Sequence, residues 1–471
     1  MKIFGRAVGI SLAILLVVAV GLALWLHDKP PRYNEPLVPT SATSPPTPVD
    51  NPLLRGMWPD NTEQDDATLM LMSISGGGSR AAAVGWKTLD VLRRSAYRFT
   101  NANGTVVDSN LANEIDLVAG ISGGSFAATA WCLKGSVTPA FQQRFVERDI
   151  QAELKRRFFS GKGILAAFST RYARINFAAE LYDEDIFERK TFADLPSRPI
   201  LRLHATNLAL GQRFTFTRDT FERLGSNLLP YPLGYACAAS SAFPILLDPL
   251  TLRNYPPSLD LEQDRSYQSG KKNARADLNV DLRNKAWEFF NNKTNEYVHL
   301  ADGGLVDNQG LQSILDEFDN NGVINRRINF SAAPLQRLII VNVNAGVAKP
   351  DASSHSPEAP DVASVVESTM VSSMDVLSAR RWMDILAQTR LLYKGRIDRP
   401  DAPAYSQLEE PYRIEISFRN IGDAELRRQA MALPTSFKLT AEQLALIDKV
   451  VPELLQEDPE FQRLQAVLSN R

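Results

Sequence analysis

One serine of the chain stands where a hydroxyl group can act as a nucleophile. Ser122 lies in the pattern Gly-x-Ser-x-Gly between Gly120 and Gly124, after a strand-like run at residues 114–118 and before a helix-like run at residues 125–133. A tight turn between a strand and a helix exposes a serine hydroxyl and aims it rigidly, and glycines let the two elements approach each other. A hydroxyl of ordinary pKa also needs an adjacent base. The pattern therefore predicts a nucleophile whose base comes from elsewhere in the chain.

A run of three glycines, Gly76 to Gly78, precedes this serine in the chain. It lies between a buried strand predicted at residues 68–74 and a helix predicted at residues 81–94. Successive backbone N–H groups at a helix N-terminus bind anions because the helix dipole is positive there. Such a loop suits a phosphate, a dinucleotide or a transient oxyanion. The lysine pattern of a P-loop is missing, but the loop alone does not choose between phosphate and oxyanion.

A carboxylate follows a third strand-like run at residues 297–301. Asp302 stands at the end of this run, and Gly303 and Gly304 come directly after it. Open α/β sheets place their functional groups at the carboxyl ends of strands. Aspartate before glycine is also a common turn former, so this position alone leaves both a base and a turn open. We interpret the nearby Asp307 and Asn308 as turn or capping residues.

These candidate groups need a sheet whose strand ends meet at one edge. Further strands are predicted at residues 199–206, 213–217, 335–343 and 412–418, and further helices at residues 231–241, 359–392 and from 424 to the C-terminus, with breaks at Pro434 and Pro452. Strands that alternate with helices indicate an α/β fold with a mostly parallel central sheet.

Four motifs in this order resemble those of the patatin-like phospholipases. They are the glycine loop followed by Arg80, the Gly-x-Ser-x-Gly pattern, a small-residue stretch at residues 239–249 that ends in prolines, and the Asp-Gly-Gly at residue 302. The resemblance covers residues 66–345, and the later segment at residues 433–437 is similar to the tail of bacterial members. It implies a three-layer α/β/α fold.

The resemblance also implies a lipid acyl hydrolase, a phospholipase or esterase, that works through a Ser-Asp dyad. Ser122 is the implied nucleophile, Asp302 the implied general base, and the product of the first step an acyl-enzyme. The implied oxyanion hole consists of the backbone N–H groups of Gly76, Gly77, Gly78 and Gly123. Arg80 either supports the loop or contacts a lipid phosphate. No cofactor or metal is implied.

Two other functions remain open from the sequence. A Ser-His-Asp triad usually places its histidine after the acid, and only His355 satisfies that order. It lies in a low-complexity stretch, whereas His299 shares a strand with Asp302 but is expected on the opposite face. The alternatives are therefore a triad esterase for soluble esters and a non-catalytic membrane scaffold that keeps the fold.

The N-terminal region has the pattern of a membrane anchor. Residues 7–26 contain no charged side chain, and a helix of that length spans about 30 Å, the thickness of the hydrocarbon core. We therefore expect a transmembrane helix within residues 1–27, with a cleaved signal peptide as the alternative. Lys2 and Arg6 precede the run, so the N-terminus should be cytoplasmic and the catalytic domain extracytoplasmic.

Residues 28–60 hold eight prolines between positions 30 and 52 and should form an extended linker.

Composition excludes several other classes of protein. The 471 residues carry a formal net charge of -2, so no overall basic field indicates a nucleic-acid partner. Cys132 and Cys237 lie in apolar surroundings without metal-ligand spacing, and the four histidines form no cluster. Neither a disulfide scaffold nor a metal site is indicated. Substrate lipid and membrane are the expected partners.

The remaining segments complete the expected domain organisation. The catalytic domain should cover residues 61–430, with a polar surface insertion at residues 251–296, and a helical segment should follow at residues 431–471. A basic and aromatic helix is expected at residues 141–159. It could contact lipid, although a solvated helix face is the more common reason for such a pattern.

Overall fold

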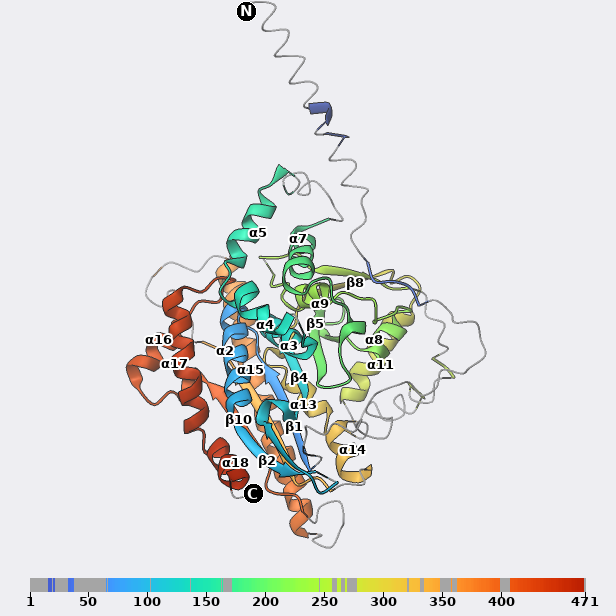
Figure 1. The fold of residues 1–471 in the computed structure, drawn as a ribbon. Helices are drawn as coiled ribbons and strands as arrows, with labels where there is room; N and C mark the ends of the chain where they lie inside the picture. Colours follow the sequence, from blue (N-terminus) through green and yellow to red (C-terminus); the bar gives the residue numbers. More distant parts are fainter. Residues whose placement is uncertain are drawn as a thin grey trace, which may run out of the picture.

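The fold is that of a computed structural model of the full chain. It describes residues 16–18, 20–21, 33–37 and 65–469, the last range with gaps at 66, 102, 136, 162, 164–171, 245, 256–260, 264–266, 269–277, 320–321, 331–333, 348–356, 358–361 and 399–406. Figure 1 shows one α/β body.

The centre of the molecule is a mostly parallel sheet of eight strands in the order β10-β9-β1-β4-β5-β8-β7, with β6 paired to β5. The strands from β10 to β5 run parallel to their neighbours, whereas β6, β7 and β8 pair in the antiparallel direction. Their bounds are β1 Thr68–Ile74, β4 Ile115–Ile121, β5 Ile200–Asn207, β6 Gln212–Thr215, β7 Leu250–Arg253, β8 Tyr297–Asp302, β9 Arg337–Asn344 and β10 Tyr412–Ser417. A separate hairpin consists of β2 Ala96–Thr100 and β3 Val106–Asn110. The expected α/β class and mostly parallel sheet are confirmed.

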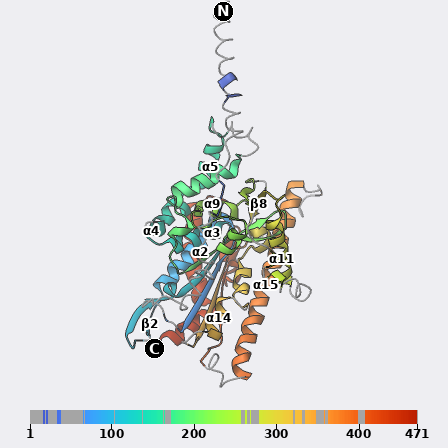
Figure 2. The same ribbon diagram turned by 90° about the vertical axis from the view of Figure 1, so that its right-hand side faces the viewer.

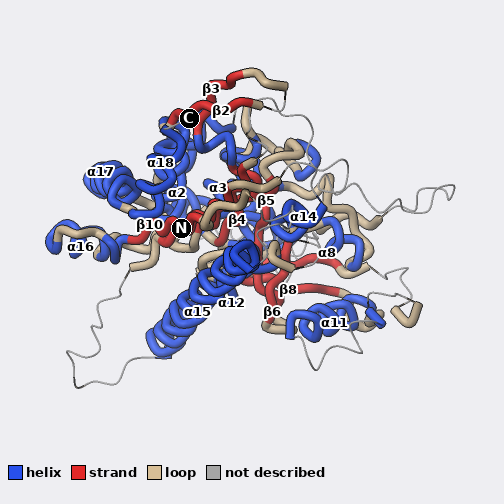
Figure 3. The backbone as a smooth tube through the Cα atoms, turned by 90° about the horizontal axis from the view of Figure 1, so that it is seen from below, coloured by secondary structure: helices blue, strands red, loops and turns tan. Residues whose placement is uncertain are grey.

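Helices cover both faces of this sheet (Figure 3). Side chains alternate along a strand, so neighbouring residues of β1 enter different cores. Met70 and Met72 belong to a large apolar cluster, whereas Leu69 and Leu71 belong to a second, smaller one. The first cluster includes residues of α2 Gly78–Arg94, α3 Gly123–Leu133, α9 Leu233–Ser240, α17 Ala441–Glu457 and α18 Pro459–Ser469. The second includes residues of α13 Leu311–Asp316, α14 Val323–Phe330 and α15 Val362–Asp398. Figure 2 shows α2 and α15 on opposite sides of the strands.

The described part of the chain contains further helices. They are α4 Val137–Phe141, α5 Ile150–Phe158, α7 Arg174–Leu181, α8 Arg218–Arg223, α11 Leu278–Asn291, α12 Gly304–Asp307 and α16 Ala424–Met431. Two π-helical turns, Gln142–Val146 and Tyr182–Ile186, continue α4 and α7.

Two sequence-based expectations about helices were wrong. The basic helix expected at residues 141–159 is interrupted, because Asp149 caps a new helix by accepting from the Ala152 amide at 2.8 Å. Pro452 does not end α17, since buried neighbours such as Val451 and Leu455 hold the helix against the core despite the lost backbone bond. The polar insertion contains the regular helix α11, which buries Trp287 and Phe290.

The described part of the N-terminal region is attached to the catalytic domain. Within the expected linker the structure describes residues 33–37, and there Asn34 Nδ2 donates to the Arg253 carbonyl at 2.9 Å. The Arg253 amide donates back to Asn34 Oδ1 at 2.8 Å, and Pro36 forms a β-bridge with Ser226. This short segment is therefore bound to the surface of the domain, at Arg253 of β7 and at Ser226.

The expected membrane anchor lies largely outside the described residues, which include only 16–18 and 20–21 of it, in helical conformation. In the part of the chain that the structure describes, no helix is both long and apolar enough to cross a bilayer.

Candidate active site

The strand-turn-helix around Ser122 has the form that its glycines predict. β4 ends at Ile121 and α3 begins at Gly123, so Ser122 alone makes the turn, with φ of 48° and ψ of -124°. This is a strained conformation with positive φ that a residue with a side chain adopts only when its surroundings impose it. A Cβ on Gly124 would lie 2.5 Å from the Ile74 and Ser75 carbonyl oxygens, so the first turn of α3 packs directly on the end of β1. The serine is thereby held at the sheet's carboxyl edge.

Asp302 is placed beside this serine by a different strand. It ends β8, which pairs antiparallel with β5 so that Ala205 lies opposite Asp302, and β5 is also the parallel neighbour of β4. The Ser122 hydroxyl donates to Asp302 Oδ2 at 2.7 Å. The Gly304 amide donates to the other oxygen, Oδ1, at 2.7 Å. Each carboxylate oxygen therefore has a defined partner, and only Oδ2 faces the hydroxyl.

Burial changes the acidity of this carboxyl group. Asp302 is only 2 % exposed, and its removal from water raises its pKa to about 6. The hydrogen bonds from Ser122 and Gly304 favour the charged form and act in the opposite direction. At neutral pH the group is ionised yet is a stronger base than an exposed aspartate.

The glycine loop lies against Ser122. A Cβ on Gly76 would be 3.2 Å from the Ser122 Cβ, and a Cβ on Gly123 would overlap the Gly78 carbonyl. Gly77 and Gly78 have φ of 141° and 62°, which favour glycine. The Ser79 amide donates to the Ser436 carbonyl at 2.8 Å, whereas the Gly77 and Gly78 amides have no acceptor among the described residues. Their position at the start of α2 leaves these N–H groups available for an anion.

Gly76 differs from the expectation for the loop. Its amide donates to the Asn308 carbonyl at 2.8 Å, so this N–H group is not available as an oxyanion donor. The available amides are those of Gly77, Gly78 and Gly123, the last at the N-terminus of α3.

Arg80 is oriented into the protein. It is 2 % exposed, and its guanidinium donates to the Ala345 carbonyl, the Leu433 carbonyl and the Thr435 hydroxyl at 2.8, 2.8 and 3.0 Å. Burial lowers its pKa to about 10, so it keeps its charge at neutral pH. Of the two roles that the sequence left open, this geometry fits support of the loop and does not fit contact with a lipid phosphate.

Three further residues contribute to the site without having been predicted. Ser240 Oγ accepts from the Ser122 amide at 2.9 Å, Asn308 holds Gly76, and Ser436 holds Ser79. Each lies in a segment that sequence analysis had marked: the small-residue stretch, the turn after the Asp-Gly-Gly, and the C-terminal tail. The sequence pattern indicates the segments. It does not predict the individual contacts, because these join residues that lie far apart in the chain.

The described histidines do not reach the dyad. His204 is buried, with its ring nitrogens beside Thr215 and Ser313, and His299 is exposed and contacts Thr251 at 3.0 Å. His355 lies outside the described residues. Cys132 and Cys237 are free and buried, and no group of three metal-ligating side chains occurs among the residues that were placed.

Comparison with known families agrees with this geometry. The family model described as patatin-like phospholipase matches residues 72–315, which is more than half of the chain. The chain belongs to this family. Membership implies hydrolysis of lipid esters in general, and the matched range contains Ser122, Asp302 and the glycine loop.

Two solved structures are similar to this chain at low sequence identity. Human GIVD cytosolic phospholipase A2 is 12% identical, with 86% of this chain and 63% of that chain covered and a TM-score of 0.40. VipD from Legionella pneumophila is 12% identical, with 82% and 67% covered and a TM-score of 0.27. This chain thus spans less than two thirds of the length of the human protein. The comparison with curated proteins finds no match.

Ser240 supplies a test of how the turn is held. In Ser240→Ala the Ser122 amide loses its buried acceptor, a change that typically costs about 1–3 kcal/mol, so the turn should relax. We expect the rate of labelling of Ser122 by a fluorophosphonate to fall by about tenfold. Ser241→Ala is the matched control, because its hydroxyl bonds only to the Cys237 and Ala238 carbonyls. Equal labelling rates for the two variants would contradict the role of Ser240.

Proposed function

We propose that this protein is a serine-dependent carboxylic ester hydrolase that cleaves lipid acyl esters through an acyl-enzyme intermediate. Ser122 is the nucleophile and Asp302 the general base. The observation that carries the proposal is the 2.7 Å hydrogen bond from the Ser122 hydroxyl to a buried carboxylate. A nucleophile in contact with its base is the arrangement that acyl transfer requires.

In the first half of the reaction the Ser122 oxygen attacks the ester carbonyl carbon and its proton passes to Asp302 Oδ2. The carbonyl oxygen becomes an oxyanion, which the Gly77, Gly78 and Gly123 amides are positioned to stabilise. One such donor typically contributes about 3–4 kcal/mol to lowering the barrier. When the tetrahedral intermediate collapses, the carbon–oxygen bond to the alcohol breaks, and the alcohol leaves with the proton from Asp302.

In the second half water replaces the alcohol. Asp302 removes a proton from the water as its oxygen attacks the acyl-enzyme, and the same amides stabilise the second oxyanion. Collapse then releases the carboxylic acid and returns the proton to Ser122. Throughout, Gly304 holds Asp302 Oδ1, so the carboxylate keeps Oδ2 directed at the reacting oxygen.

The dyad is tested by removing each of its two groups. Ser122→Ala removes the nucleophile, and Asp302→Asn keeps the size of the side chain but removes the base. We expect each variant to lose roughly 10³-fold or more in kcat/KM on a short acyl ester, because neither group works without the other. Hydrolysis of a chromogenic ester is the measurement.

His355→Ala is the control for the triad alternative, and it should retain normal activity. If His355→Ala were inactive while Asp302→Asn remained active, a histidine triad would replace the dyad. If the wild-type protein hydrolysed no ester and bound no fluorophosphonate, the scaffold alternative would stand.

The acidity of Asp302 predicts the pH dependence. The ionised carboxylate is the base, and burial raises its pKa to about 6. The value of kcat/KM should therefore fall tenfold per pH unit below about pH 6 and be level from about pH 7 to about pH 8. An uncharged ester keeps substrate ionisation out of the profile. A profile that remained flat down to about pH 4 would contradict Asp302 as the base.

We further propose that residues 7–26 anchor the protein in a membrane with the catalytic domain on the extracytoplasmic side. The support is the uncharged run and the preceding Lys2 and Arg6. The full chain should remain in the membrane fraction after alkaline carbonate extraction. A Ser44→Cys variant should react with a membrane-impermeant maleimide in intact cells, whereas the buried Cys132 and Cys237 should not. Release by carbonate, or a mature chain that lacks these residues, would contradict the anchor.

A further inference from the structure

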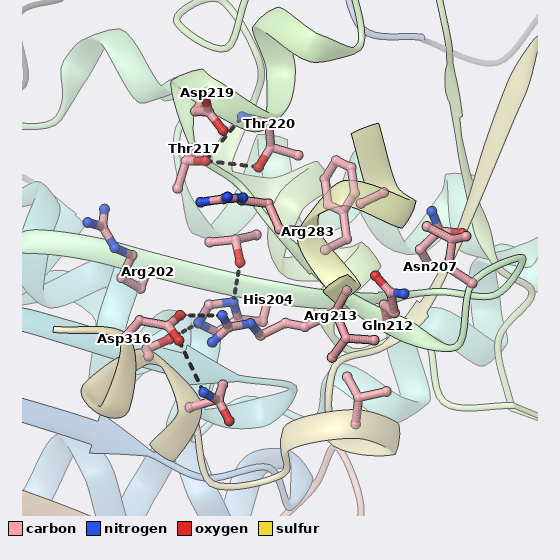
Figure 4. Close-up of a pocket in the computed structure, with 18 of the residues that line it drawn as sticks. Arg202, His204, Asn207, Gln212, Arg213, Thr217, Asp219, Thr220, Arg283 and Asp316 are labelled. Carbon is pink, nitrogen blue, oxygen red and sulfur yellow. Dashed lines mark hydrogen bonds and ion pairs between the residues drawn. The ribbon is translucent and has the colours of Figure 1, made fainter. Parts of the chain in front are cut away.

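A large cavity with both polar and apolar lining lies beside the segment that carries Asp302. It has a volume of about 760 Å³ and is enclosed by residues of β5, β6, α8, α11, α13 and α15 (Figure 4). Leu305 and Val306, which follow the Asp-Gly-Gly, are part of its wall, but Ser122, Asp302 and the glycine loop are not. The cavity is therefore separate from the dyad, and its size is that of a small-molecule site.

Arginine is the dominant charged residue of this cavity. Its lining includes five arginines and four acidic side chains, namely Arg202, Arg213, Arg223, Arg283 and Arg381 with Asp219, Asp316, Glu317 and Asp319. Arg213 pairs with Asp316, and Arg202 is 3.6 Å from Glu317. Arg283 has no acidic partner among the described residues, and its guanidinium lies 4.8 Å from the centre of the Trp287 ring. Figure 4 shows that Arg202, Arg213 and Arg283 come from three different elements and that Arg213 is directed at Asp316.

Two buried donors of this cavity lack an acceptor. Asn207 is 2 % exposed, and its Oδ1 accepts from the Ala209 amide at 3.0 Å, whereas its Nδ2 has no partner within the described residues. Arg213 Nη2 is held by Asp316, but Nη1 is buried and has no partner there. Buried polar groups are nearly always hydrogen-bonded, and both of these are donors. A ligand that satisfies them must supply acceptors.

We propose that this cavity binds a phosphate group. The polar end of the ligand is held by the open donors of Asn207, Arg213 and Arg283, because guanidinium groups match the geometry of phosphate oxygens. Trp287, Leu305 and Leu377 provide apolar wall for the carbon part of a phosphate ester. The phosphate can come from the headgroup of a phospholipid or from a small soluble phosphate ester, and both present the same oxygens to the site.

Calorimetric titration of the full chain in neutral detergent tests this site. The Ser122→Ala background prevents turnover, so binding is measured whether or not the proposed dyad is catalytic. Glycerol 3-phosphate is the soluble probe and dihexanoylphosphatidylglycerol is the lipid probe. Arg283→Gln removes the guanidinium, and Asn207→Asp keeps the Oδ1 acceptor for Ala209 but replaces the donor with a repelling oxygen. Each should weaken binding by about tenfold or more.

Lys285→Gln is the matched control, because this lysine lies on the same helix, is exposed and pairs with Asp281 outside the cavity. It should bind like the parent protein. Binding of the lipid probe alone would support the site and assign it to a headgroup, and binding of glycerol 3-phosphate would support a soluble ester as the source. If neither probe bound, or if Arg283→Gln and Asn207→Asp bound as tightly as Lys285→Gln, the proposal would be overturned.

Discussion

The candidate site depends on one hydrogen bond between a hydroxyl and a carboxylate that lie 180 positions apart in the chain. The two groups reach each other because β5 pairs with β4 on one side and with β8 on the other. β8 runs antiparallel to β5. This pairing brings Asp302 to the level of Ala205, near the edge where β4 ends directly before Ser122. The same packing removes the carboxylate from water and makes it a stronger base.

The second constraint concerns the backbone of the glycine loop. Gly76 is held by Asn308 and Ser79 by Ser436, whereas Arg80 is held by Ala345, just after β9, and by the C-terminal segment. Between these fixed points the Gly77 and Gly78 amides have no hydrogen-bond acceptor among the described residues. A preorganised donor is more effective than one that must reorient during the reaction. The segment between α16 and α17 thus contributes to the site by holding a loop near the start of the domain.

The sequence allowed most local features to be predicted. β1 and the helix after the glycine loop follow from an apolar run and a Gly-rich turn, and the order of motifs indicated the family. Contacts between distant segments could not be predicted, since nothing local in Ser240 or Ser436 distinguishes them from other serines in turns. The prediction that the Gly76 amide is an oxyanion donor was wrong, because this amide donates to the Asn308 carbonyl. That acceptor is a backbone atom, so no residue type in the sequence reveals it. The local effect of Pro452 predicts a helix end, but the packing of α17 against the core keeps the helix intact.

The central claim is that Ser122, Asp302 and two free amides meet at one point. A crystal structure of the protein after reaction with a methyl phosphonate ester tests it most directly, because the adduct imitates the tetrahedral intermediate. The account predicts a bond from Ser122 Oγ to phosphorus, with the phosphonyl oxygen about 2.7–3.1 Å from the Gly77 and Gly78 amide nitrogens. An adduct on another residue, or an oxygen directed away from both amides, would contradict it.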